Sequence, residues 1–81
     1  MGYGIAEVAL LAGYRTSLRD IRSDFVERGL SLINESLEKL ISKKLVSEIQ
    51  YHRITKELLH GTVDLEEALQ NVDFVLEGVV V

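Results

Sequence analysis

The chain has 81 residues, of which 47% are hydrophobic and 27% are charged. This length allows one small domain over residues 1–81 and excludes a complete two-domain enzyme, while the composition excludes a disordered chain. The net charge of −4, with no concentrated basic face, argues against nucleic-acid binding, and no apolar stretch approaches the ~20 residues that cross a bilayer.

The sequence contains no cysteine, and its start lacks the pattern of a secretory signal, so we expect a cytoplasmic protein. Proline is also absent, which leaves long helices uninterrupted. A domain of this size buries a limited share of its surface, so its stability must come from packing or from partners.

The first predicted element is a helix that ends at Gly13, because glycine is the usual residue just beyond a helix C-terminus. Its apolar residues recur with helical spacing and would form one face: Ile5, Val8, Ala9 and Ala12.

The next segment, Tyr14 to Ile21, fits two patterns. Thr16 and Leu18 alternate with polar residues as in a strand. The same segment has the Ser17–Asp20 spacing of a capping box, followed by apolar residues three and four apart. It is therefore compatible with a strand or with a helix that runs from about Leu18 to Lys44.

A long amphipathic helix is predicted next. Its apolar stripe steps by four and three residues: Val26, Leu30, Ile33, Leu37 and Leu40. Asp24 and Glu27 have the spacing of a capping box at its start.

Two further helices are predicted from capping-box spacings. Ser47 and Gln50 open one helix, which His60 and Gly61 would close. Asp64 and Glu67 open a short helix that runs to about Asn71. The apolar, β-branched tail from Phe74 to Val81 has the pattern of a buried strand in a parallel sheet.

Several segments in this order resemble the nucleotide-binding half of the L-3-hydroxyacyl-CoA dehydrogenases. The matching segments are Met1–Val8, Ala12–Tyr14, Leu18–Ile21, Leu37–Leu40, Thr62–Leu69 and Val72–Glu77. The resemblance covers essentially the whole chain. It implies a link to fatty acid metabolism and NAD as the cofactor.

The resemblance implies three cofactor-binding residues. Gly2 matches the third glycine of the family's G-x-G-x-M-G-x-G-I-A motif, Asp20 matches the acid that binds the adenosine ribose hydroxyls, and Gly78 matches a small residue against the cofactor. The first two glycines of the motif, which let backbone amides approach the diphosphate, have no counterpart here. Asp20 also has a simpler interpretation as a helix-capping or solvated acid.

The family's catalytic histidine, its acidic partner and its helical dimerization domain all follow the position of Val81, so no catalytic residue is expected in this chain. We therefore expect a remnant of a dehydrogenase NAD-binding domain, with weak or no NAD binding and no activity alone. The alternative is a small helical protein–protein interaction module, or a subunit that a partner chain completes. Self-association or a partner would use the helices or the C-terminal apolar tail.

In the family, a strand precedes the glycine motif, and it too has no counterpart here. Its loss decides the expected fold class, because that strand is the centre of a Rossmann-type sheet. Without it, segments 14–20 and 74–81 would have to pair directly as a parallel ribbon, and isolated ribbons are marginal. We therefore expect a mainly α protein, a small bundle of about four helices. The alternative is an incomplete Rossmann-like α/β fold with two or three strands.

No metal is expected either. His52 and His60 are eight residues apart, so on one helix they would lie ~12 Å apart along the axis and could not share an ion.

Overall fold

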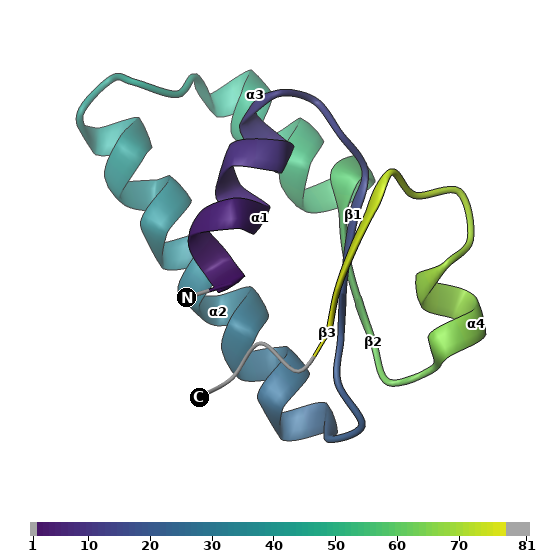
Figure 1. Cartoon of the computed structure of the whole chain (residues 1–81). Helices are drawn as coiled ribbons and strands as arrows, with labels where there is room; N and C mark the ends of the chain where they lie inside the picture. The colour runs from purple at the N-terminus through teal and green to yellow at the C-terminus, as the bar shows by residue number, and fades with distance from the viewer. Residues whose placement is uncertain (1, 78–81) are drawn as a thin grey trace.

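The computed structural model describes residues 2–77, which form a three-stranded parallel sheet with helices on both faces (Figure 1). The elements in chain order are α1 (Gly2–Leu11), β1 (Thr16–Arg19), α2 (Ser23–Ser42), α3 (Glu48–Arg53), a single π-helical turn η1 (Ile54–Leu58), β2 (Leu59–Thr62), α4 (Leu65–Ala68) and β3 (Phe74–Glu77).

The expectation of a mainly α bundle is wrong. The strand order is β2-β1-β3, and β1 pairs in parallel with both neighbours, Thr16 lying opposite Leu59 on one side and Phe74 on the other. The α/β alternative with three strands describes the chain correctly. The segments around residues 16 and 74 do pair directly, and β2 on the far side of β1 turns the unfavourable two-stranded ribbon into a sheet.

The helices divide unequally between the faces of the sheet. Helices α1 and α2, with α3 beyond them, lie on one face, and α4 alone lies on the other (Figure 1). The main core is therefore between the sheet and the first two helices. Its buried members are Ala6, Leu10, Leu18, Ile33, Leu37, Ile54 and Leu58.

The long helix was predicted correctly, since the stripe from Val26 to Leu40 lies within α2 and its residues Val26, Ile33 and Leu37 are buried. Its start differs in detail from the prediction. The N-cap is Arg22, without a side-chain cap, and Asp24 lies in the first turn. The proposed capping box at Asp24 is therefore not formed.

The other helix ends follow the sequence signals more closely. Gly13 has φ +92°, the conformation that ends α1. The Ser47 hydroxyl accepts the Gln50 N–H at 3.1 Å, and the Asp64 carboxylate accepts the Glu66 N–H at 2.9 Å. Helix α4 then ends at Ala68, three residues earlier than expected.

Strand β2 was missed. The sequence predicted that His60 and Gly61 close a helix, but the helix ends at Leu58 and both residues lie in a strand. Gly61 is required there because α2 crosses close by: a Cβ on Gly61 would lie 2.6 Å from Leu30 Cδ1 and 2.8 Å from Val26 Cγ1. Glycine in this strand marks a close approach of two elements, not a helix end.

The ambiguous segment 14–21 is a strand over Thr16–Arg19 followed by a turn. Leu18 is 1% exposed, whereas Ile21 is 78% exposed, so the helical stripe that would have joined them does not exist. The single helix from Leu18 to Lys44 is ruled out, and α2 begins at Ser23.

Candidate site at the C-terminal edge of the sheet

The carboxyl ends of the three parallel strands lie at one edge of the sheet. Strand β1 ends at Arg19, β2 at Thr62 and β3 at Glu77. Helix α1 runs antiparallel to β1, so its first residues point toward the same edge (Figure 1). In open α/β sheets, ligands bind outside this edge because loops and helix starts converge there.

Asp20 follows directly after the central strand and is half-buried at this edge. One of its carboxylate oxygens, Oδ1, accepts the backbone N–H of Arg22 at 3.1 Å. This bond fixes the turn between β1 and α2, and it leaves the second oxygen without a protein donor among the described residues. A carboxylate held in this way can accept hydrogen bonds from a ligand diol. Asp20 lies before the helix and not within its first turn, unlike in the helix-capping interpretation.

Two residues further along the chain, the Arg22 guanidinium contacts both the Asp24 carboxylate and the Phe25 ring. It donates to Asp24 through Nε at 3.1 Å and through Nη2 at 2.6 Å, and it lies over the Phe25 ring, 4.1 Å from the ring centroid. The hydrogen bond with Arg22 lowers the pKa of the Asp24 carboxyl, and the same bond raises the pKa of Arg22. The positive charge of Arg22, two residues after Asp20, is thus already paired.

Arg19 is paired as well. Its Nη1 lies 2.7 Å from Glu77 Oε1, and its Nε donates to the Val63 carbonyl at 3.1 Å. The guanidinium therefore joins the ends of all three strands. The turn containing Asp20 begins directly after Arg19 at this edge.

The two predicted glycines have different outcomes. Gly2 is the first residue of α1, where a helix start points toward the strand ends. Gly78 lies outside the described residues.

The two histidines considered as metal ligands contact different residues. The His60 Nε2 lies 2.7 Å from Glu67 Oε1, which ties β2 to α4, while the His52 ring packs edge-on against Tyr51. Among residues 2–77, no group of three or more His, Cys, Asp or Glu side chains has the arrangement of a metal site. Within the same residues, no helix has both the length and the apolar character needed to cross a membrane.

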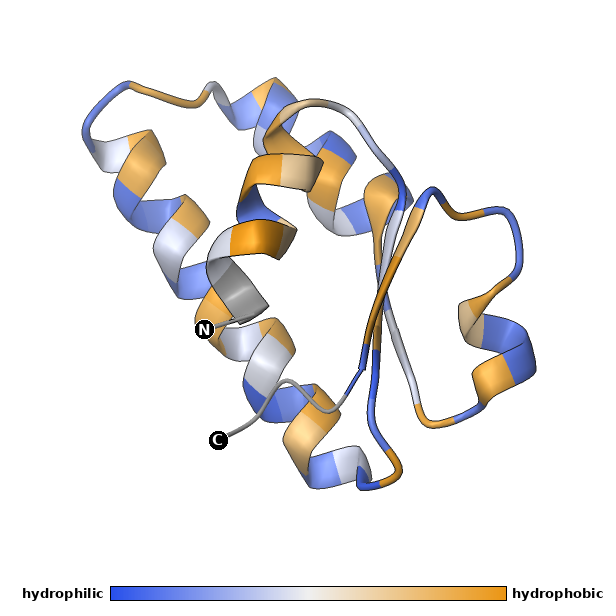
Figure 2. Cartoon of the chain, in the orientation of Figure 1, coloured by the Kyte–Doolittle hydropathy of each residue, from blue (hydrophilic) through white to orange (hydrophobic). Residues whose placement is uncertain are grey.

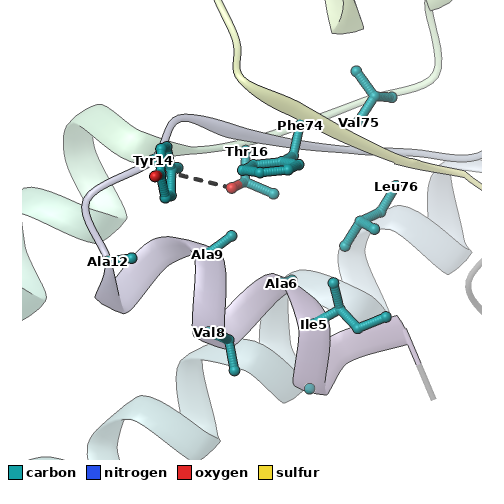
Figure 3. A pocket seen from close by; sticks show the side chains of 11 residues that line it. Ile5, Ala6, Val8, Ala9, Ala12, Tyr14, Thr16, Phe74, Val75 and Leu76 are labelled. Carbon is teal, nitrogen blue, oxygen red and sulfur yellow. Dashed lines mark hydrogen bonds between the residues drawn. The ribbon is translucent and has the colours of Figure 1, made fainter.

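A second feature, which sequence reasoning missed, is an apolar groove of about 510 Å³ between α1 and the edge strand β3. Phe74 and Leu76 point toward α1 across it, while Val75 points away (Figure 3). Tyr14 closes one end through an edge-to-face contact with Phe74, with ring centroids 5.3 Å apart.

The groove corrects the predicted face of α1. Ala6 and Leu10 face the core, whereas Ile5 and Val8 are 65% and 69% exposed. Helix α1 is apolar around most of its circumference (Figure 2). That property was a readable signal, because a helix that is apolar on two sides has two surfaces to cover.

The comparisons with known proteins agree with one another. The model of the family described as "3-hydroxyacyl-CoA dehydrogenase, NAD binding domain" matches residues 1–80. The chain is 32% identical over 80 residues to a probable 3-hydroxybutyryl-CoA dehydrogenase of Deinococcus radiodurans, a match that covers 99% of this chain and 28% of that protein.

Two other proteins are also similar to this chain. Over 80 residues the chain is 31% identical to a glyoxysomal fatty acid beta-oxidation multifunctional protein of Brassica napus, covering 99% of this chain and 11% of the relative. Over 48 residues it is 46% identical to the 3-hydroxybutyryl-CoA dehydrogenase of Bradyrhizobium diazoefficiens. This match covers 59% of this chain and 16% of that protein. The chain thus spans less than a third of the length of each of these relatives.

Proposed function

Because the chain belongs to the family of 3-hydroxyacyl-CoA dehydrogenase NAD-binding domains, we propose that it contacts the adenosine half of NAD through Asp20. The observation that carries the proposal is the position of this carboxylate, half-buried at the end of the central strand with one oxygen fixed by the Arg22 N–H. In dinucleotide-binding sheets, an acid at this place accepts hydrogen bonds from the ribose hydroxyls.

The surrounding charges support a ribose without a 2′-phosphate. Arg19 is bound to Glu77, and Arg22 is bound to Asp24. No unpaired guanidinium is therefore offered by these two neighbours of Asp20, and its own negative charge repels a phosphate. This arrangement fits NAD, whose chemistry when bound is to accept a hydride from the substrate.

The affinity for NAD is expected to be weak. Backbone amides at a glycine-rich turn supply most of the grip on a dinucleotide diphosphate, and Gly2 is the only counterpart of the fingerprint glycines in these 81 residues. A carboxylate–diol contact alone supports a dissociation constant above ~1 mM.

We propose further that the chain alone does not oxidise 3-hydroxyacyl-CoA. The names of its relatives place such oxidation, and fatty acid beta-oxidation, in proteins more than three times its length. The role proposed for this chain is limited to contact with the cofactor.

An NMR titration with NAD tests the site. The amide signals of Asp20, Ile21 and Arg22 should shift at millimolar NAD, and Asp20→Asn should reduce these shifts strongly. Asp73→Asn is the matched control, because Asp73 lies at the opposite end of β3 and its carboxylate accepts the Arg15 N–H. Shifts confined to other residues would overturn the site, and micromolar binding would overturn the expected weak affinity.

An activity assay tests the second part. With 3-hydroxybutyryl-CoA and NAD at millimolar concentrations, no NADH absorbance should develop above the background without protein. Turnover that Asp20→Asn abolishes would contradict this part of the proposal while supporting the site.

A further inference from the structure

Within residues 2–77, strand β3 has one unpaired edge. It pairs with β1 on one side only, since the strand order is β2-β1-β3. The Phe74 N–H donates to the Arg15 carbonyl at 3.1 Å and so points toward β1. Successive N–H groups alternate along a strand, so the Val75 N–H points to the open edge.

Although β3 is short, its edge lacks two of the features that keep edge strands apart. Natural edges carry lysine, proline or a bulge, and β3 reads Phe-Val-Leu-Glu with none of the first two. The acids that bracket it are already held, because Glu77 is paired with Arg19 and the Asp73 carboxylate accepts the Arg15 N–H. Backbone pairing at this edge therefore meets no unpaired lysine and little free charge.

The apolar groove between α1 and β3 lies beside the same edge. Large apolar side chains from α1, the following loop and β3 are exposed in it. They are Ile5 (65% exposed), Val8 (69%), Tyr14 (47%) and Phe74 (45%). Their exposed parts come to roughly 400 Å² per copy, given that a large side chain has about 150–250 Å². The largest apolar patch on a typical monomer is about this size and is often functional.

We propose that a second copy of this chain occupies the groove, with the two β3 strands paired antiparallel in one continuous six-stranded sheet. Antiparallel pairing of identical edges has a two-fold axis perpendicular to the sheet, so the interface is self-complementary. The axis keeps both α1 helices on the same face. Ile5 and Val8 of the two copies then meet over the seam and cover Phe74 and Leu76.

The area argues for a second copy at modest affinity. A standard interface buries about 800 Å² on each partner. The four exposed side chains supply about half of that, and the β3 backbone with the rest of the groove lining supplies more. We expect a dimer with a dissociation constant on the order of 10⁻⁵ M.

Two variants and one control test the interface. Ile5→Glu places a charge in the groove and should raise the dimer dissociation constant at least about tenfold. Ile49→Glu is matched to it, because Ile49 is also an exposed isoleucine near a helix start, 84% exposed on α3 outside this groove. It should dimerize as the unmodified chain does.

The second variant, Val75→Pro, tests strand pairing itself. It removes the N–H that points to the open edge and spares the one at residue 74 that bonds β1, so the sheet should persist while dimerization is lost. Circular dichroism checks the fold, and if this variant does not fold, Ile5→Glu and amide exchange still decide the question.

Sedimentation equilibrium from about 5 to 500 μM measures the outcome for the whole chain. The proposal expects a concentration-dependent mass of two chains, and protection of the Val75 amide from hydrogen exchange that rises in step with it. A monomer throughout this range, or a dimer that neither variant weakens, overturns the proposal. Loss of the dimer in Ile5→Glu but not in folded Val75→Pro overturns the continuous sheet. A monomer that binds only a foreign strand peptide also overturns the assignment to a second copy.

Discussion

Arg19 binds Glu77 across the β1–β3 pair, with Nη1 and Oε1 2.7 Å apart. The two side chains lie opposite one another in the register of the sheet, and the arginine side chain is 21% exposed. Because the same guanidinium also donates to the Val63 carbonyl, it holds the ends of β2 and β3 to the central strand. This bridge fixes the edge on which Asp20 lies.

Loss of this bridge should weaken the fold. Arg19→Ala is expected to lower the free energy of unfolding by about 1–2 kcal/mol, and Glu77→Gln by about 0.5–1 kcal/mol, since the pair is partly screened by solvent. Urea denaturation measures both. Arg22→Gln is the comparison, because its pair with Asp24 is exposed and its removal should lower the denaturation midpoint much less than Arg19→Ala does. Equal effects of the two arginine variants would contradict the bridging role.

Removal of the Ser17 hydroxyl should stabilise the protein. Ser17 is 0% exposed in the central strand, and its Oγ has no hydrogen-bond partner among the described residues. Ser17→Ala should raise the free energy of unfolding by about 1 kcal/mol, because a buried hydroxyl without a partner carries its full desolvation cost. A thermal melt shows whether Ser17→Ala is more or less stable than the unmodified chain. Destabilisation instead would show that a buried water satisfies the hydroxyl in solution.

Gly61→Ala should destabilise the protein by about 1–3 kcal/mol, since the new methyl group would overlap Val26 and Leu30 of α2. Gly4→Ala is the matched control. A Cβ on Gly4 meets nothing within 4 Å, and alanine favours the helix, so that variant should be neutral or slightly stabilised. Chemical denaturation of both variants, and partial rescue of Gly61→Ala by Val26→Ala, would establish the close approach of β2 and α2.

The Asp24 carboxyl should titrate below the ordinary aspartate pKa of ~3.9, because it accepts two hydrogen bonds from Arg22. A depressed pKa in the folded state means that the contribution of this group to stability is present above the unfolded pKa and is lost as the pH falls through the folded one. Carboxyl ¹³C NMR follows the titration. In Arg22→Gln the pKa should rise toward the ordinary value, and an unchanged pKa would show that the pair does not persist in solution.

The elements that were correctly predicted carry their signals locally. The apolar stripe of α2, the caps at Ser47 and Asp64 and the stop at Gly13 each depend on residues within one or two turns. Asp20 was identified through the family resemblance alone. It is half-buried directly after β1, and its cofactor-binding role stays a prediction.

The elements that the sequence did not predict depend on partners that are distant in the sequence. Residues 59–62 contain a histidine and a glycine and have little intrinsic strand preference, so they form a strand only because β1 lies alongside. The same holds for residues 16–19, whose choice between helix and strand is settled by pairing on both sides. The groove was missed because Ile5 and Val8 have helical spacing, which indicates a face but not whether anything covers it.

The parallel pairing of β1 with β3 joins residues 58 positions apart, as in the Arg19–Glu77 contact. Closing so long a loop costs entropy before any contact compensates for it, so this pairing should form late in folding. During synthesis β1 would be paired at most with β2 until residues 74–77 have emerged. The side of the central strand that β3 finally covers is thus open in the nascent chain until that point.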